Sequence, residues 1–169
     1  RGLDAVILRP GQIIGPGCEA VTPNGVVSLR GWNLVGDGRF LLPLVYVDDV
    51  VDALLLAAFR PGVAGEVFNI VDPEPVTQRE YLSRWRARAP GVPLRHVPWG
   101  MALAAAWCVE FLCRVLRRDA PLTPYRVKSL RPLSPFDVGK AARMLGWQPR
   151  IGVRTGLDRT FGVAVEPPR

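Results

Sequence analysis

Three aspartates lie close together in the sequence and are the first candidates for chemistry. Asp48, Asp49 and Asp52 follow the apolar segment Val45–Val47 and could act as metal ligands or as acid–base groups. Their spacing does not match the alternating oxygen ligands of a calcium-binding loop. We therefore expect no metal site. Asp48 should cap the start of a helix, where negative charge is favoured, and the others should lie on its solvated face.

The groups that other enzyme classes need are scarce in this chain. His96 is the single histidine and no G-x-S-x-G motif occurs, so a hydrolase with a Ser-His-Asp triad is poorly supported. Cys18, Cys108 and Cys113 form no C-x-x-C pair, which argues against a zinc site and against a disulfide framework. This use of cysteine favours a reducing, cytoplasmic setting.

The segments around these residues alternate between strand and helix patterns. Ala5–Leu8 is an apolar run followed by Arg9-Pro10-Gly11, which predicts a buried parallel strand that opens into a loop. Glu66–Val71 and Leu94–Val97 are further strand candidates. Thr77 and Glu80 form a capping box. The expected helices are residues 26–32, 50–58, 78–89, 99–118, 138–145 (ended by Gly146) and 155–165. This alternation predicts an α/β fold.

The longest expected helix, Trp99–Arg118, is strongly apolar in its first half. Glu110 and Arg114 interrupt it, whereas a membrane span needs about 20 mostly apolar residues. We expect a helix packed into the core, with Met101, Trp107 and Phe111 buried. Its basic end leaves peripheral contact with a membrane surface as the alternative.

The overall charge is basic, with 22 Lys and Arg against 15 Asp and Glu and a net charge of +7. No basic patch with interleaved aromatic residues occurs, so nucleic-acid binding is not expected. The apolar content of 49% suffices for a core. The sequence reaches a strand candidate almost at once, and from this we expect a truncated domain.

Four segments, in this order, resemble the extended short-chain dehydrogenase/reductases, the NAD-dependent epimerase/dehydratase family. Val6–Gly17 is similar to the strand and loop that follow the family's catalytic helix. Gly36–Arg39 with Val45–Ala53 is similar to its hairpin and V-x-V-x-D-V-x-x-A helix start, and Gly65–Val71 to the last strand of its main sheet. Asp137–Pro149 is similar to its K-A-x-x-x-L-G-W-x-P segment. The resemblance covers nearly the whole chain.

This resemblance implies the C-terminal part of a Rossmann-like, doubly wound parallel sheet with a mostly helical substrate-binding cap. We expect residues 1–98 to belong to the sheet domain, with inserted cap segments, and residues 99–169 to form the cap. The implied cofactor is NAD or NADP. In the family, the loop after the first strand contacts the nicotinamide, which gives Pro10, Gly11, Gln12 and Ile13 as cofactor-binding residues here. Gly11 lacks a Cβ, which would let a flat ring approach.

The chain departs from the family in its catalytic machinery. The G-x-x-G-x-x-G phosphate loop is absent. The residues four positions after Tyr46, Tyr81 and Tyr125 are Val50, Trp85 and Ser129, so no Tyr-x-x-x-Lys pair occurs. We expect no catalytic residue in this chain and no activity from the chain alone.

The second departure concerns the substrate. Leu42 lies near the position where many nucleotide-sugar enzymes of the family have an arginine, and leucine cannot clamp a diphosphate. The implied substrate-binding residues are Gln12, Arg39 and Tyr46. Together with the long apolar helix, this favours the 3-beta-hydroxysteroid/sterol dehydrogenase-like branch, acting on an alcohol or ketone.

Two other functions stay open on the sequence. One is a nucleotide-sugar epimerase or dehydratase, and the other is a non-catalytic family member that serves as a nucleotide-binding or assembly subunit. The expected partner is a small-molecule substrate. A homodimer and membrane contact through Trp99–Arg118 are further alternatives.

Overall fold

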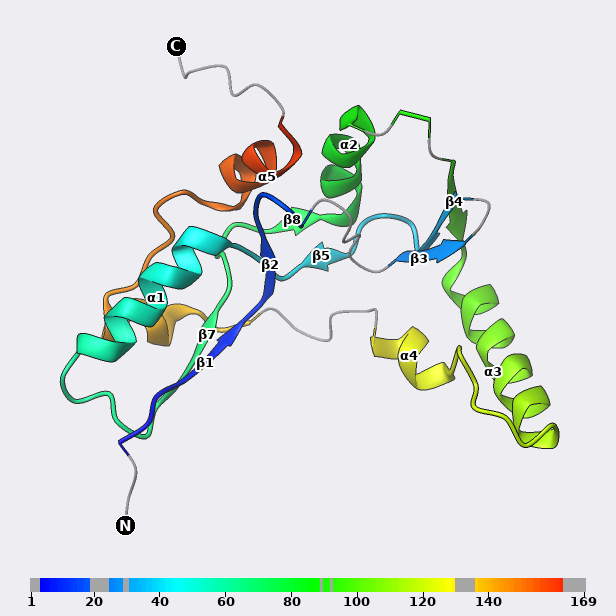
Figure 1. Ribbon diagram of the computed structural model, residues 1–169, viewed down its shortest axis with the longest axis horizontal. Helices are drawn as coiled ribbons and strands as arrows, with labels where there is room; N and C mark the ends of the chain where they lie inside the picture. Colours follow the sequence, from blue (N-terminus) through cyan, green and yellow to red (C-terminus); the bar gives the residue numbers. More distant parts are fainter. Residues whose placement is uncertain are drawn as a thin grey trace.

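The computed structural model describes residues 4–18, 25–28, 31–88, 90–91, 93–129 and 136–162. Its centre is built from two parallel strand pairs that share one continuous stretch of chain (Figure 1). Strand β1 (Ile7–Pro10) pairs with β7 (Val67–Ile70), and β2 (Gln12–Ile14) pairs with β6 (Leu44–Tyr46). The chain therefore changes its pairing partner at Gly11. The predicted α/β class is confirmed.

The first strand lies where the sequence predicts a parallel strand, but it is not buried. Ile7 is 53% exposed, and only Leu8 of this strand is half-buried. Side chains of a strand project from the faces of the sheet, and the described residues leave the face at Ile7 uncovered. The apolar run predicts a strand that is buried on both faces, whereas the described residues bury β1 only in part.

The remaining strands form two further sheets, one of three strands and one of two. The first has the order β3 (Gly25–Ser28), β4 (Gly31–Val35) and β9 (Leu94–Val97), with β4 parallel to β9. In the second, β5 (Leu41–Leu42) pairs antiparallel with β8 (Val76–Thr77). The helix expected at residues 26–32 is wrong, because this segment forms the β3–β4 hairpin. Its adjacent valines, Val26 and Val27, are β-branched and favour strands.

Five α-helices and one π-helical turn are described. They are α1 (Val47–Phe59), α2 (Gln78–Arg88), α3 (Trp99–Val115), α4 (Pro124–Ser129), η1 (Ala141–Leu145) and α5 (Val153–Phe161). The expected capping box is present, since the Glu80 amide donates to the Thr77 hydroxyl at 3.2 Å. Gly146 ends η1 with φ 71°, as predicted. Sequence analysis missed α4, although Thr123 and Pro124 form a recognisable helix start.

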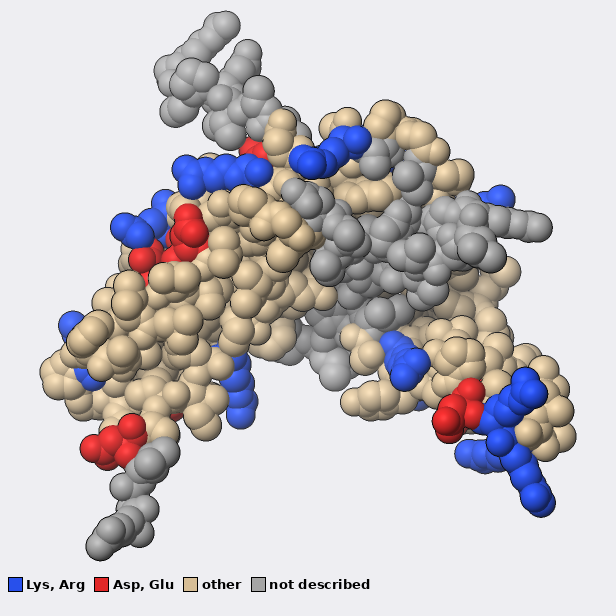
Figure 2. Space-filling model, in the orientation of Figure 1, with Lys and Arg blue, Asp and Glu red and all other residues tan. Residues whose placement is uncertain are grey.

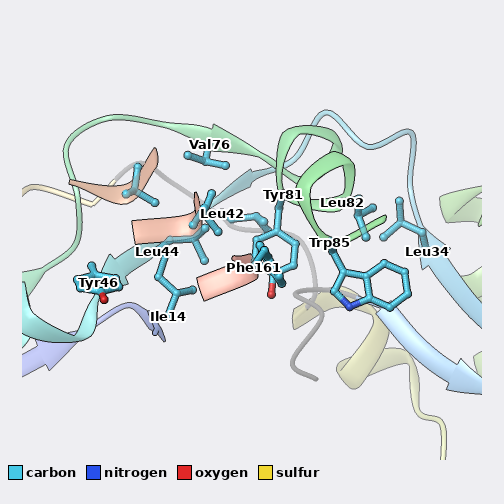
Figure 3. Packing of buried hydrophobic residues seen from close by; sticks show 12 residues of the cluster. Ile14, Leu34, Leu42, Leu44, Tyr46, Val76, Tyr81, Leu82, Trp85 and Phe161 are labelled. Carbon is cyan, nitrogen blue, oxygen red and sulfur yellow. The ribbon is translucent and has the colours of Figure 1, made fainter. Parts of the chain in front are cut away.

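Two buried clusters on opposite faces of the central strands make the body a three-layer structure. Leu44 and Tyr46 point to the face that α2 and α5 cover, where Tyr81 and Phe161 meet edge to face at 5.2 Å (Figure 3). Val45 points to the other face, which α1 and η1 cover. This alternation follows from strand geometry, because successive side chains of a strand point to opposite faces of the sheet.

A third buried cluster holds α3 and α4 at one end of the molecule, away from α1 (Figure 1). It joins Val35 of β4 to Ala102 and Ala106 of α3 and to Val127 of α4. The segments η1 and α5 return to the central strands, so part of residues 99–169 packs on the sheet body. The division into a sheet domain and a cap stays a prediction.

Candidate functional site

The bend between β1 and β2 is held from two sides by backbone hydrogen bonds. The Gly11 amide donates to the Ile70 carbonyl at 3.0 Å, and the Gln12 amide donates to the Pro43 carbonyl at 2.6 Å. These two bonds mark the point where the chain leaves β7 and joins β6. The first bond holds the bend at the carboxyl end of β7, beside the end of β1, and the second holds it to the residue before β6. The carboxyl ends of parallel strands are where α/β folds bind their ligands.

Glycine at position 11 is required by the packing of the chain itself. A Cβ on Gly11 would lie 2.2 Å from the Pro43 carbonyl oxygen and 3.0 Å from its carbon. Val71 adds a methyl group at 3.2 Å. The missing Cβ therefore makes room for the Pro43 backbone, and not for a flat ring as the sequence suggested.

The bend is nevertheless open to a ligand. Pro10, Gln12 and Ile13 are exposed, and Gly11 is half-buried. Ile14, the residue that follows the bend, is buried in the core and anchors the C-terminal end of the bend. The structure thus brings the four predicted cofactor-binding residues into one accessible, rigidly held segment.

Arg39 lies in an exposed turn, and Tyr46 pairs with Ile14 next to the bend but has a buried side chain. The Arg39 side chain is 81% exposed and pairs with Asp37 at 3.6 Å, within the turn between β4 and β5. Tyr46 is 4% exposed and belongs to the core. Its ring lies against Gly156 and 6.0 Å from the Arg159 guanidinium. Burial in the core speaks against the predicted contact between Tyr46 and a substrate.

The aspartates at the start of α1 are structural, in a way that the sequence did not indicate. Asp48 is exposed and makes no cap, because the N-cap position belongs to Tyr46 and carries no side-chain hydrogen bond. Asp49 is fully buried and accepts backbone N–H groups of residues 150, 151 and 152 at 2.8, 3.1 and 3.2 Å. The prediction of a cap at Asp48 and a solvated Asp49 is wrong.

Two further carboxylates complete this attachment of the C-terminal segment. Asp52 accepts from the Arg150 guanidinium at 2.8 Å, on the surface. Asp72 accepts from the amides of Val153 at 2.7 Å and Glu74 at 2.8 Å. Burial raises the pKa of Asp72 above its ordinary value of 3.8. Among the residues that the structure describes, no group of His, Cys, Asp and Glu is arranged to hold a metal ion.

A shallow depression of about 450 Å³ lies between the start of α1 and α5, apart from the bend. Its lining residues are Asp48, Val51, Asp52, Arg150, Ile151 and Arg159. Its charges are already partly matched within the chain, since Arg150 binds Asp52. We therefore place the candidate site at the Gly11 bend.

Comparison with known proteins agrees with the motifs and the fold. Residues 1–71 match the NAD dependent epimerase/dehydratase family. The first 71 residues of the chain are therefore similar to the NAD-dependent epimerase/dehydratase family. The matched residues include the Gly11 bend and β1, β2, β6 and β7, so the family region and the candidate site coincide.

Several curated relatives of this chain are named for reactions of sterols or ketones. The decarboxylating sterol-4-alpha-carboxylate 3-dehydrogenase of Saccharomyces cerevisiae is 32% identical, over 92% of this chain and 48% of its own length. A farnesyl-dihydroquinoline-oxide ketoreductase of Stigmatella aurantiaca is 32% identical, over 93% of this chain and 48% of its own. The chain spans about half the length of these relatives, which fits the C-terminal half that the motif order predicts.

Solved structures show the same fold at low identity. The protein gox2253 superposes with a TM-score of 0.68 at 23% identity, over 94% of this chain and 48% of its own. UDP-glucuronic acid 4-epimerase from Bacillus cereus, solved with UDP-glucuronic acid and NAD, gives 0.58 at 18% identity, over 95% and 45%. The expected Rossmann-like architecture is confirmed.

Proposed function

We propose that this chain is the part of an NAD(P)-dependent oxidoreductase that supplies the nicotinamide-side bend and the substrate cap. The observation that carries the proposal is the accessible bend from Pro10 to Ile13, which lies at the carboxyl ends of β1 and β7 and is held by backbone bonds to Ile70 and Pro43. The bound cofactor would accept or donate a hydride. The bend would orient the nicotinamide, and Gln12, with its exposed side chain, is the candidate to contact the substrate.

The proton-transferring group would come from outside this chain. Tyr81 is buried, and this burial raises its pKa to about 12, so it stays protonated and cannot act as a base near neutral pH. Tyr46 is packed into the core. Tyr125 is exposed on α4, at the end of the molecule away from β1 (Figure 1). None of the three precedes a lysine at the family's spacing.

A hydrophobic alcohol or ketone is the substrate class that we favour. Leu42 is buried against Val76 in the core cluster, so no cation stands at the position of the diphosphate clamp. Arg39 binds Asp37 and lies in the preceding turn. The named chemistry of the curated relatives, sterol dehydrogenation and ketone reduction, supports the same choice.

The test is a hydride-transfer assay at 340 nm on the longer protein that we propose contains this chain. With NAD⁺ or NADP⁺ we expect turnover of a 3-beta-hydroxysterol and none of a UDP-sugar, and calorimetry should rank binding in the same order. Turnover of the UDP-sugar alone would overturn the substrate proposal. Turnover by the 169-residue chain alone would overturn the assignment of the catalytic pair to another segment.

A further inference from the structure

Helix α3 packs with its small side chains and exposes its large ones. Ala102 and Ala106 are buried against Val35 and Val127. Trp107 and Phe111 are 59% and 70% exposed, contrary to the buried positions that the sequence predicts. The large exposed apolar residues at this end of the molecule are Met101, Trp107, Phe111, Leu112, Val115 and Leu116.

These exposed residues form one continuous apolar face, which we call the α3 outer face. At about 100° per residue, Phe111 and Val115 point nearly opposite to the buried Ala106, and Trp107 and Leu112 lie to either side. No charged residue interrupts this arc, because Glu110 lies on the half-buried side and Arg114 at its margin. Monomeric soluble proteins rarely leave such a patch uncovered, and it marks a surface that contacts a membrane or another protein.

Positive charge surrounds the end of the α3 outer face. Arg114, Arg117 and Arg118 are exposed at the end of α3, and Arg126 and Lys128 are exposed on α4. Figure 2 shows Lys and Arg side chains gathered at this tip of the molecule. The nearby acids are Glu110, 3.9 Å from Arg114, and Asp119. The cations outnumber the acids, and most of the cationic charge is unmatched.

We propose that the α3 outer face docks this chain on the surface of an anionic membrane. The apolar side chains would enter the boundary between headgroups and acyl chains, and the arginines would meet lipid phosphates and carboxylates. Trp107 suits this boundary, where its ring is enriched in membrane proteins. Within the described residues no helix combines the length and the apolarity of a membrane crossing, so α3 would lie in the surface plane.

Charge complementarity favours lipid over a second copy of the chain. A second copy has the same net charge of +7 and would offer its own basic tip few acidic partners. An anionic bilayer supplies negative charge along the whole length of the helix. The position of α3 and α4 at the end away from β1 leaves the Gly11 bend free during docking (Figure 1).

Co-sedimentation with vesicles tests this proposal. We expect the longer protein that we propose contains this chain to bind vesicles of roughly three parts phosphatidylcholine to one part phosphatidylserine, and to bind pure phosphatidylcholine more weakly. The W107S/F111S double variant should lose at least about tenfold in binding, because two aromatic anchors are removed. Arg114→Gln with Arg118→Gln should lose about fivefold for each charge, and raising the salt should reproduce this loss.

The matched control is the double variant Leu55→Ser with Phe59→Ser, which removes exposed apolar residues from α1 at the other end of the chain. It should bind vesicles as the unchanged protein does, and circular dichroism should show that all variants are folded. Vesicle binding that survives W107S/F111S, or no binding to the anionic vesicles, would overturn the proposal. So would a dimer in lipid-free solution that W107S/F111S converts to a monomer. Docking needs no cofactor, so its failure leaves the proposed hydride transfer untouched.

Discussion

Gly11 couples the candidate site to the stability of the fold. Its backbone is bonded to β7 through Ile70, its neighbour Gln12 is bonded to Pro43, and the position of its absent Cβ is filled by the Pro43 carbonyl. The sequence suggested that glycine is needed at position 11 for ligand binding, and the structure shows that it is needed for packing. Substitutions at this position will affect folding as well as binding.

We expect Gly11→Ala to lower the free energy of unfolding by about 1–3 kcal/mol, because a methyl group 2.2 Å from a backbone oxygen forces the strands apart. Denaturant unfolding followed by circular dichroism measures the change. Gly91→Ala is the control, since a Cβ there meets no atom within 4 Å, and it should change stability by less than about 0.5 kcal/mol. Equal effects of the two variants would contradict the packing role.

Asp72 gives a prediction about pH. Burial raises its pKa in the folded chain above 3.8, so the folded state binds more protons than the unfolded state between 3.8 and that raised pKa. The contribution of Asp72 to stability therefore falls as pH rises through this window. The thermal midpoint of the unchanged chain minus that of Asp72→Asn, followed from pH 3.5 to 7, isolates this contribution and should fall as pH rises. A difference that rises with pH would contradict the sign.

At the scale of elements, the contact between α5 and β6 depends on Gly156. A Cβ at this position would lie 2.6 Å from Cδ2 of the Tyr46 ring and 3.0 Å from its Cβ and Cγ. Tyr46 is buried and cannot move aside. The helix α5 can therefore pack closely on β6 because residue 156 has no side chain.

Two effects oppose each other in Gly156→Ala. Alanine favours a helix interior over glycine by about 1 kcal/mol, while overpacking costs about 1–3 kcal/mol. Because the ring behind position 156 is buried on all sides, we expect overpacking to win and thermal unfolding to occur at lower temperature. In Gly100→Ala, on α3, a Cβ meets no atom within 4 Å, so only the helix-propensity gain should remain. A stabilising Gly156→Ala would show that α5 can shift on the strand.

At the scale of the whole molecule, Asp49 ties two segments that lie about a hundred residues apart in the chain. Its buried carboxylate satisfies three consecutive backbone N–H groups just before α5. The indole of Trp147 adds a bond to the Asp49 carbonyl at 2.8 Å. This attachment brings η1 and α5 back onto the central strands.

Asp49→Asn should destabilise the chain by about 2–3 kcal/mol, since an amide offers one acceptor oxygen to three donors and turns an N–H₂ group toward them. Hydrogen exchange should accelerate at residues 150–152 and across α5. Asp48→Asn, at the exposed neighbouring position, should leave exchange and stability nearly unchanged. Unchanged exchange in Asp49→Asn would show that other contacts hold the segment.

The sequence by itself determined the α/β class, the parallel strands near Ile7 and Val67, the capped helix after Thr77 and the similarity to the family. These features depend on local periodicity, turn residues and short motifs, which are written within a few positions of the chain. It did not reveal the β3–β4 hairpin, where local patterns suit either structure and pairing decides between them.

Only the tertiary structure decided what fills the space at Gly11, where Asp49 directs its carboxylate and which side of α3 is covered. Each of these depends on residues distant in sequence that meet in the fold. Small and large residues of α3 are both apolar, so an apolar pattern carries no signal for its inner face. The small alanines of α3 face inward because Val35 and Val127 fill the neighbouring space, and contacts of this kind exist only after the chain has folded.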